Sequence, residues 1–230
     1  MAEVIFLGRG AGYKPSLGPT AAYFREGTRL YLIDCGTSAF ERLDRMGAFG
    51  GVCAITVFIS HLHADHAGSL GILLEYCSDV LRIRPVLVHP GRSILAYLDI
   101  TGTSRESYTW RADYKSADEN GVRAVFYPVT HVPGMDCYGY LISTATQDSF
   151  YFSGDAVDIP SEILSRLYDG SLDCVYQDTA STDSKSHCAL EKLKALVPEA
   201  YRSHVYCVHL DTEEPDAFLE AGFRITESSL

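Results

Sequence analysis

At residues 59–68 the chain reads Ile59-Ser60-His61-Leu62-His63-Ala64-Asp65-His66-Ala67-Gly68. Three imidazoles and a carboxylate therefore lie within six positions. The apolar run just before them, residues 54–59, predicts a fully buried strand. A helix is predicted directly afterwards, over residues 68–76, because its apolar positions are Leu70, Leu73 and Leu74. Polar side chains between a buried strand and a helix indicate a site at a strand end.

The spacing of these side chains fits metal binding. His61 and His63 are two apart, so at an extended strand end they point the same way and can share one cation. Asp65 and His66, on the turn that follows, can face a second cation close by. A solvated histidine-rich loop is the alternative, and it would be the better explanation of a single histidine. The H-x-H-x-D-H pattern behind a buried strand favours a metal site.

The composition is that of one large globular domain. Of the 230 residues, 47% are hydrophobic and 21% are charged, which allows one domain over residues 1–230 with a core of its own. No apolar run approaches the length of a bilayer span, and the first residues lack the basic segment of a signal peptide. We therefore expect a cytoplasmic protein with no membrane partner.

Charge and cysteine content narrow the partners and the redox chemistry. The formal net charge is −11, which disfavours extended nucleic acid because polyanion binding relies on clustered Lys and Arg. The seven cysteines are odd in number and form no C-x-x-C pair, which argues against a disulfide framework or a separate cysteine-bound zinc. We expect a small-molecule substrate and cysteines that act as small hydrophobic side chains.

The motif at residues 61–66 resembles the signature of the metallo-β-lactamase superfamily, and the likeness extends through most of the chain. The resemblance implies an α/β (α+β) fold, a four-layer αββα sandwich, and two transition metals. In that superfamily a third His, a bridging Asp and a last His follow at later strand ends. This sequence supplies each once, as His131, Asp155 and His209.

The resemblance also implies how the metals are held. The first metal would be bound by His61, His63 and His131, and the second by Asp65, His66 and His209, with Asp155 between the two. This set favours two Zn²⁺, although Mn²⁺ or Fe²⁺ can occupy mixed nitrogen and oxygen ligands. Two supporting carboxylates are expected, Asp34 and Asp178. In the superfamily the Asp matching Asp34 holds the outer ring nitrogens of the histidines; the alternative is that it caps a helix over residues 37–46.

Features outside the motif resemble the ribonuclease Z-like phosphodiesterase branch. Residues 6–12 are similar to that group's F-L-G-T-G-x-G opening, with Arg9 in place of Thr. Arg9 either meets a substrate phosphate or faces solvent. The interval from His131 to Asp155, 24 residues (155 − 131), leaves room only for a hairpin. Ribonuclease Z itself usually carries a tRNA-gripping arm there, so tRNA processing is disfavoured.

His187 is the predicted catalytic acid. It lies 22 residues before His209 (209 − 187), which resembles the spacing of the catalytic and the last metal-binding His in the ribonuclease Z group. We expect it at the start of a helix capped by Ser186; the alternative is an ordinary surface residue of that helix. Asp65 would accept the proton of the attacking water, and His187 would donate one to the leaving alkoxide.

These features favour a dinuclear metal-dependent hydrolase. It would be a phosphodiesterase that cleaves a small or cyclic nucleotide, or a short RNA end, with a metal-bridging hydroxide. The alternatives are a thioesterase or lactonase on the same metals, and a non-catalytic metal-binding module. A homodimer is expected by resemblance only. The segment 100–120, long and without a pattern of its own, would be a lid, a dimer contact or a plain surface insertion.

Overall fold

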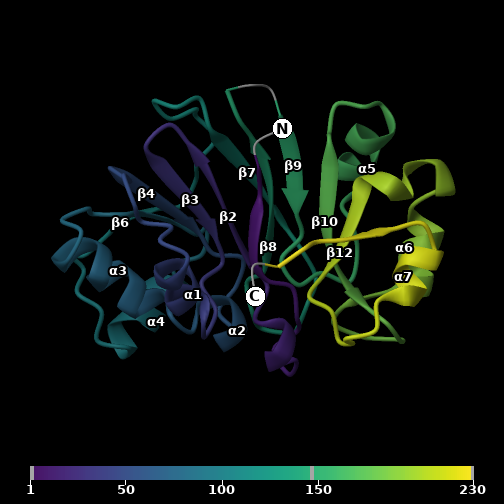
Figure 1. Ribbon diagram of the computed structural model, residues 1–230, viewed down its shortest axis with the longest axis horizontal. Coiled ribbons are helices and arrows are strands. Elements are labelled where there is room, and N and C mark those ends of the chain that lie inside the picture. The colour runs from purple at the N-terminus through teal and green to yellow at the C-terminus, as the bar shows by residue number, and fades with distance from the viewer. Residues whose placement is uncertain (1–2, 146–147, 229–230) are drawn as a thin grey trace.

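The first of two β-sheets holds the N-terminal half of the chain in the computed structural model, which describes residues 3–145 and 148–228 (Figure 1). Its strand order is β1-β2-β3-β4-β5-β6. Strands β1 to β3 pair antiparallel, and β3 to β6 run parallel. The strands are β1 (Ile5–Gly8), β2 (Ala21–Glu26), β3 (Arg29–Ile33), β4 (Ala54–Phe58), β5 (Val86–Val88) and β6 (Thr109–Arg111).

The second sheet holds the C-terminal half, in the order β13-β12-β10-β9-β8-β7, with β11 beside β10. Strands β7 to β9 form an antiparallel meander, and the remaining pairs are parallel. The strands are β7 (Arg123–Pro128), β8 (Tyr138–Ser143), β9 (Ser149–Phe152), β10 (Cys174–Ala180), β11 (Cys188–Ala189), β12 (Val205–Val208) and β13 (Arg224–Ile225). The interval between His131 and Asp155 is thus a hairpin, as predicted.

Helices cover the outer face of each sheet (Figure 1). On the first sheet lie α1 (Ala39–Arg45), α3 (Leu70–Asp79) and α4 (Ser93–Ile100), with the short α2 (Ala64–Ala67) at one end. On the second lie α5 (Ser161–Tyr168), α6 (Leu190–Leu196) and α7 (Asp216–Glu220). Two short 3-10 helices are η1 (Pro15–Leu17) and η2 (Glu199–His204). None of the described helices combines the length and the apolarity needed to cross a bilayer.

Strand β3 shows why the sequence forms four layers. Successive side chains of a strand point to opposite faces. Leu30 and Leu32 therefore pack against the helices, while Tyr31 and Ile33 face the second sheet. Between the sheets, the ring of Tyr31 stacks on that of Phe24 with centroids 4.8 Å apart. Because both faces are buried, such a strand reads as an unbroken apolar run. The predicted four-layer αββα sandwich is confirmed.

The segment 100–120 differs from the patternless loop that the sequence suggested. It contains β6, which pairs parallel with β5, and its Tyr108 and Tyr114 are buried. The strand escaped notice because it is a three-residue edge strand whose outer residues, Thr109 and Arg111, are exposed. A role for this segment as a lid or a dimer contact stays a prediction.

Candidate metal centre

The predicted site residues meet at one end of the sandwich, where several strands end. His61 follows β4, His131 follows β7, Asp155 follows β9 and His209 follows β12. Ligand sites in α/β sheets commonly lie beyond the carboxyl ends of strands. The two sheets therefore contribute to one cluster although its residues span most of the sequence.

The first group of donors consists of His61, His63, His131 and Asp155. His63 Nδ1 lies 3.0 Å from His61 Nε2 and 3.2 Å from His131 Nε2. Asp155 Oδ2 lies 3.7 Å from His61 Nε2 and 3.5 Å from His131 Nε2. Four tetrahedral ligands at about 2.1 Å from a Zn²⁺ are about 3.4 Å from one another. The spacing of the donors therefore matches the edges of such a tetrahedron.

The second group consists of Asp65, His66, His209 and again Asp155. Asp65 Oδ2 lies 3.5 Å from His66 Nε2 and 3.3 Å from His209 Nε2. The two oxygens of Asp155 divide between the rings, with Oδ1 at 3.1 Å from His66 Nε2 and Oδ2 at 3.4 Å from His209 Nε2. Asp155 is therefore common to both groups, in the bridging place that the resemblance predicts.

Two buried atoms at the centre of the cluster lack hydrogen-bond partners. They are His66 Nε2 and Asp155 Oδ1, in side chains that are almost fully buried. Leaving such an atom unsatisfied costs about 1–3 kcal/mol. A cation between the donors would satisfy both atoms, so the residues present fit a divalent metal.

The electrostatics of the cluster suit the same role. Burial alone would raise the pKa of Asp155, but the charges of His209 and His66 outweigh it and hold this pKa well below its ordinary value. Burial, and after it the charge of His66, lowers the pKa of His61 well below its ordinary value. Asp155 is thus an ionised oxygen ligand and His61 a neutral nitrogen ligand, which are the forms that bind a metal.

The outer ring nitrogens are held by acceptors that turn the inner nitrogens toward the cluster. His131 Nδ1 donates to the carbonyl oxygen of Ser186 at 2.8 Å, and His66 Nδ1 donates to Asp34 Oδ2 at 2.8 Å. A carbonyl or carboxylate oxygen only accepts, so the proton lies on Nδ1 and the lone pair of Nε2 faces inward. The sequence gave no hint of the Ser186 carbonyl, because a backbone acceptor leaves no residue-type signal.

Asp34 lies where the sequence predicts a supporting carboxylate. Besides His66 it accepts hydrogen bonds from Ser60 N and Ser60 Oγ, both at 2.7 Å. Ser60 Oγ is also 3.0 Å from His61 Nδ1, so one carboxylate steadies two rings of the cluster. Helix α1 begins after Ser38, and Asp34 does not cap it. Ser60 is a site residue that the sequence analysis missed, although it directly precedes the motif.

Asp178, the second predicted support, lies between two imidazoles. Its Oδ2 accepts a hydrogen bond from His187 Nδ1 at 2.7 Å, and its Oδ1 lies 3.3 Å from His209 Nδ1. Burial lowers the pKa of His187, but the hydrogen bond to Asp178 and the charge of that carboxylate outweigh burial and raise it. His187 Nδ1 is 4.0 Å from Asp155 Oδ2, so its ring stands beside the cluster.

His187 reaches this place from a turn, and the predicted helix start at Ser186 is wrong. Cys188 and Ala189 form β11, paired with Thr179 and Ala180 of β10, and α6 begins only at Leu190. The extended pairing holds the chain out of a helical conformation at this point. A local pattern does not reveal it, because the partner strand lies elsewhere in the sequence.

Arg9 is the one predicted site residue that the structure does not bring to the cluster. Its Nη1 donates to the carbonyl oxygen of Thr226 at 2.7 Å, and the residues that line the cleft over the cluster do not include it. The turn that follows does reach the site, since Ala11 N donates to Leu210 O at 2.9 Å. A Cβ at Gly12 would lie 2.7 Å from Asp65 Oδ2, so this turn passes directly against the cluster.

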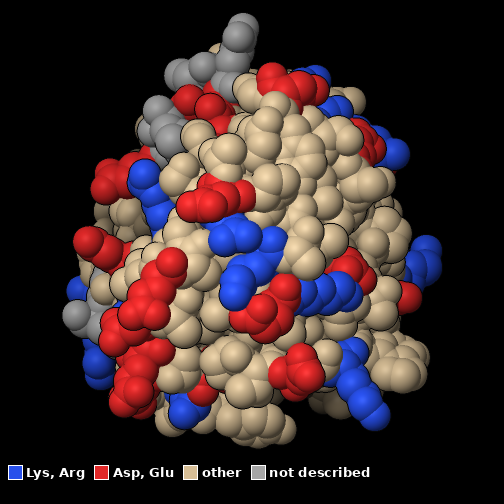
Figure 2. Space-filling model, turned by 90° about the vertical axis from the view of Figure 1, so that its right-hand side faces the viewer, with Lys and Arg blue, Asp and Glu red and all other residues tan. Residues whose placement is uncertain are grey.

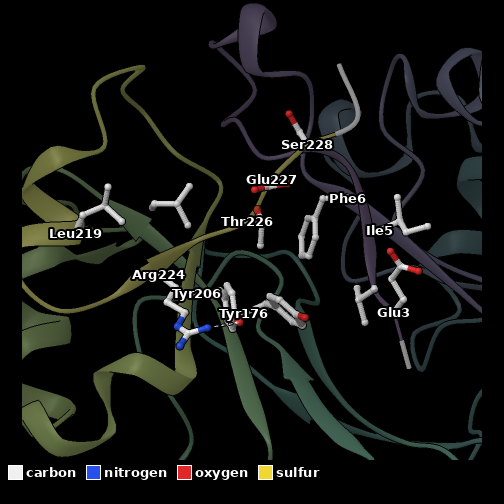
Figure 3. A pocket seen from close by; sticks show the side chains of 12 residues that line it. Glu3, Ile5, Phe6, Tyr176, Tyr206, Leu219, Arg224, Thr226, Glu227 and Ser228 are labelled. Carbon is white, nitrogen blue, oxygen red and sulfur yellow. Dashed lines mark hydrogen bonds between the residues drawn. The ribbon is translucent and has the colours of Figure 1, made fainter. Parts of the chain in front are cut away.

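A cleft of about 450 Å³ opens over the cluster. Its lining includes His63, Asp65, Asp155 and His187. A larger hollow of about 640 Å³ lies between β1 and β13, over the rings of Phe6, Tyr176 and Tyr206 (Figure 3). None of the donors lines that larger hollow, so the cleft over the cluster is the candidate active site.

Comparison with known proteins agrees with the resemblance. A family model for the beta-lactamase superfamily domain matches residues 29–210. The anti-Pycsar protein Apyc1 of Paenibacillus harenae is 27% identical over 222 residues, covering 90% of this chain and 89% of that protein. A ribonuclease Z of Mycobacterium avium (strain 104) is 35% identical over 75 residues, covering 32% of this chain and 26% of that one. The metallo-beta-lactamase fold protein YhfI of Bacillus subtilis matches with a TM-score of 0.76 at 16% identity, over 99% of this chain and 97% of its own.

Proposed function

The chain belongs to the beta-lactamase superfamily, and we propose that within it the protein is a phosphodiesterase that cleaves a small or cyclic nucleotide or a short RNA end. The observation that carries the proposal is His187, held by Asp178 at 2.7 Å and standing 4.0 Å from Asp155. A phosphodiester has a poor alkoxide leaving group that needs an acid, whereas a thiolate does not. An acid poised beside the donor cluster therefore favours the phosphodiester.

The two groups of donors would hold two Zn²⁺, bridged by Asp155. Mn²⁺ or Fe²⁺ would suit the same mixture of imidazole and carboxylate ligands. When bound, the cations supply Lewis acidity toward the phosphoryl oxygens and lower the pKa of the attacking water. Among the relatives, the one named ribonuclease Z supports a phosphodiester substrate by its name.

Asp65 and His187 would move the protons. Burial raises the pKa of Asp65, but hydrogen bonds with His209 and His66 outweigh it and keep this pKa below its ordinary value. The carboxylate is therefore free to accept a proton from the water as that water attacks phosphorus. The bond from phosphorus to the leaving oxygen breaks, and His187 gives this oxygen the proton of its Nε2 while Nδ1 stays bonded to Asp178.

Surface charge supports a small substrate. On the face that carries α5, α6 and α7, Lys and Arg lie among Asp and Glu and form no continuous basic stripe (Figure 2). Ion pairs such as Arg166 with Glu162 and Lys192 with Asp158 neutralise them locally. Extended nucleic acid would need clustered, unpaired cations.

The test is hydrolysis by zinc-loaded protein of a cyclic nucleotide, a p-nitrophenyl phosphodiester, a thioester and a lactone. We expect turnover of both phosphodiesters only. His187→Ala should lower kcat by about 10²–10⁴ for the alkoxide leaving group. The loss should be smaller for p-nitrophenolate, which leaves without a proton, and the zinc content should not change.

His204→Ala is the matched control, because His204 is exposed on η2 and contacts only the backbone of Asp173. It should behave as the unaltered protein. Turnover of the thioester or the lactone without turnover of the phosphodiesters would overturn the proposal. Zinc binding without turnover of any of the four would instead indicate a metal-binding module.

A further inference from the structure

A second hollow, of about 290 Å³, adjoins the cleft and shares Tyr13, His187 and His209 with it. Its remaining wall comes from Lys14, Asp211 and the loop 180–184. We propose that this hollow, the leaving-group lobe, binds the nucleoside of the leaving group, with the ring of Tyr13 stacked on the base. The inference rests on the phosphodiesterase function proposed above and adds which side of the cleft holds the base.

The turn that carries Tyr13 is fixed in place beside the cluster. Ala11 N donates to Leu210 O, and Lys14 N donates to Ala11 O at 2.8 Å. Gly10 forms bridges with Pro19 and with Leu210. Yet the side chain of Tyr13 is 98% exposed. The fold thus holds an aromatic ring at the mouth of both hollows without packing it against the protein.

Such a ring is a stacking platform. An aromatic side chain that stacks on a nucleobase contributes to binding whatever the base, because every base has a π-face. The backbone of Tyr13 is already ordered, so little conformational freedom is lost when a base covers its ring. This accounts for an exposed Tyr beside a catalytic cleft better than chance exposure does.

The wall of the lobe leaves polar groups free for a ligand. Ser184 Oγ accepts a hydrogen bond from His187 N at 3.1 Å, and Asp211 accepts one from Ser181 N at 2.9 Å. These two contacts hold the loop 180–184 in shape. Lys14, Thr182 and Asp183 form no side-chain hydrogen bond or ion pair with any residue of the described ranges 3–145 and 148–228. They offer a donor, a hydroxyl and an acceptor to whatever enters.

This chemistry matches the edge of a nucleobase and mismatches an acyl chain. A base presents hydrogen-bond donors and acceptors side by side, which Lys14 and Asp183 can meet. An apolar acyl or thioester group in the same place would desolvate both charges without giving them a partner.

His187 fixes which part of the substrate enters the lobe. The leaving oxygen must come within hydrogen-bond reach, about 3 Å, of the His187 ring. His187 lines the lobe as well as the cleft. The group attached to the leaving oxygen therefore extends into the lobe, while the phosphoryl group stays over the donor cluster.

The test compares a nucleoside 3′,5′-cyclic phosphate with ribose 3′,5′-cyclic phosphate, which lacks the base. In the zinc-loaded protein the base-bearing substrate should have the higher kcat/KM. Tyr13→Ala should reduce this preference about tenfold, whereas Tyr13→Phe, which keeps the ring, should retain it. Calorimetric binding of a nucleoside monophosphate should weaken about tenfold in Tyr13→Ala only.

Ile100→Ala is the control, because Ile100 is 87% exposed at the end of α4 and lines neither hollow. It should leave the preference and the binding unchanged. If Tyr13→Ala lowers kcat/KM equally for the two substrates, the lobe does not hold the base, and the inference fails while the proposed function stands. If the unaltered protein hydrolyses neither substrate nor the p-nitrophenyl phosphodiester, the proposed function fails and the assignment of the lobe fails with it.

Discussion

Asp155 is the single side chain on which both groups of donors depend. It is 2% exposed, it approaches four imidazoles of the cluster within 3.7 Å, and the charges around it keep it ionised. A carboxylate buried among histidines is stable only if positive charge balances it. Protonated imidazoles supply that charge in the absence of metal, and cations would supply it in the loaded protein.

Asp155→Ala should therefore remove metal from both groups, whereas loss of a ligand of one group would leave the other group a full set. Elemental analysis of protein purified with excess Zn²⁺ should show less than one ion per chain. Asp158→Asn is the matched control, since Asp158 lies three residues on and pairs only with the exposed Lys192. Retention of two ions by Asp155→Ala would contradict a bridging role.

At the scale of elements, short turns after the strands aim the donors, and some of these turns are strained. Asp34 and His209 have φ values of 60° and 57°, in the left-handed region that non-glycine residues seldom occupy. Gly154, which precedes Asp155 after β9, has a φ of 58°. Strain of this kind is found where a fold over-determines a functional conformation.

Gly154→Ala should destabilise the protein for two reasons. The left-handed conformation costs a non-glycine residue about 1–2 kcal/mol, and the added Cβ would lie 2.7 Å from Ser60 Cβ, a steric overlap that typically costs about 1–3 kcal/mol. Urea unfolding monitored by circular dichroism would measure the sum.

Gly170→Ala separates the two contributions. Gly170 has a φ of 78°, and nothing lies within 4 Å of a Cβ placed there. This variant should lose only the backbone contribution. Equal losses of unfolding free energy in the two variants would show that the approach of Gly154 to Ser60 is not restrictive.

At the scale of the molecule, the donor cluster joins the two halves of the sandwich. His61, His63, Asp65 and His66 follow β4 of the first sheet, whereas His131, Asp155 and His209 follow strands of the second. A cation shared by these donors would therefore link the sheets. Because the unfolded chain cannot present the donors together, metal binding would add directly to the free energy of unfolding.

Chelation should accordingly lower the melting temperature. A metal at about 1,000 times its Kd contributes about 4 kcal/mol, which for a chain of this length corresponds to about 10 °C. Differential scanning calorimetry with and without EDTA would measure the shift. Asp155→Ala should melt at the same temperature in both conditions. An unchanged melting temperature for the unaltered protein would contradict metal-linked stability. The homodimer expected by resemblance stays a prediction.

The sequence by itself determined the four-layer fold and the members of the cluster. Buried strands read as apolar runs, and the donors follow such runs in a fixed order, so a local pattern is enough to find them. Even the supporting Asp34 could be found, because it too ends an apolar strand.

The tertiary structure alone decided what depends on contacts between distant segments. It set His187 on a turn beside β11 instead of a helix, turned Arg9 toward Thr226, and brought the turn of Tyr13 against the donor cluster through Leu210. Each of these outcomes depends on a backbone partner far along the chain. Since a backbone group is the same for every residue type, no pattern of side chains announces it.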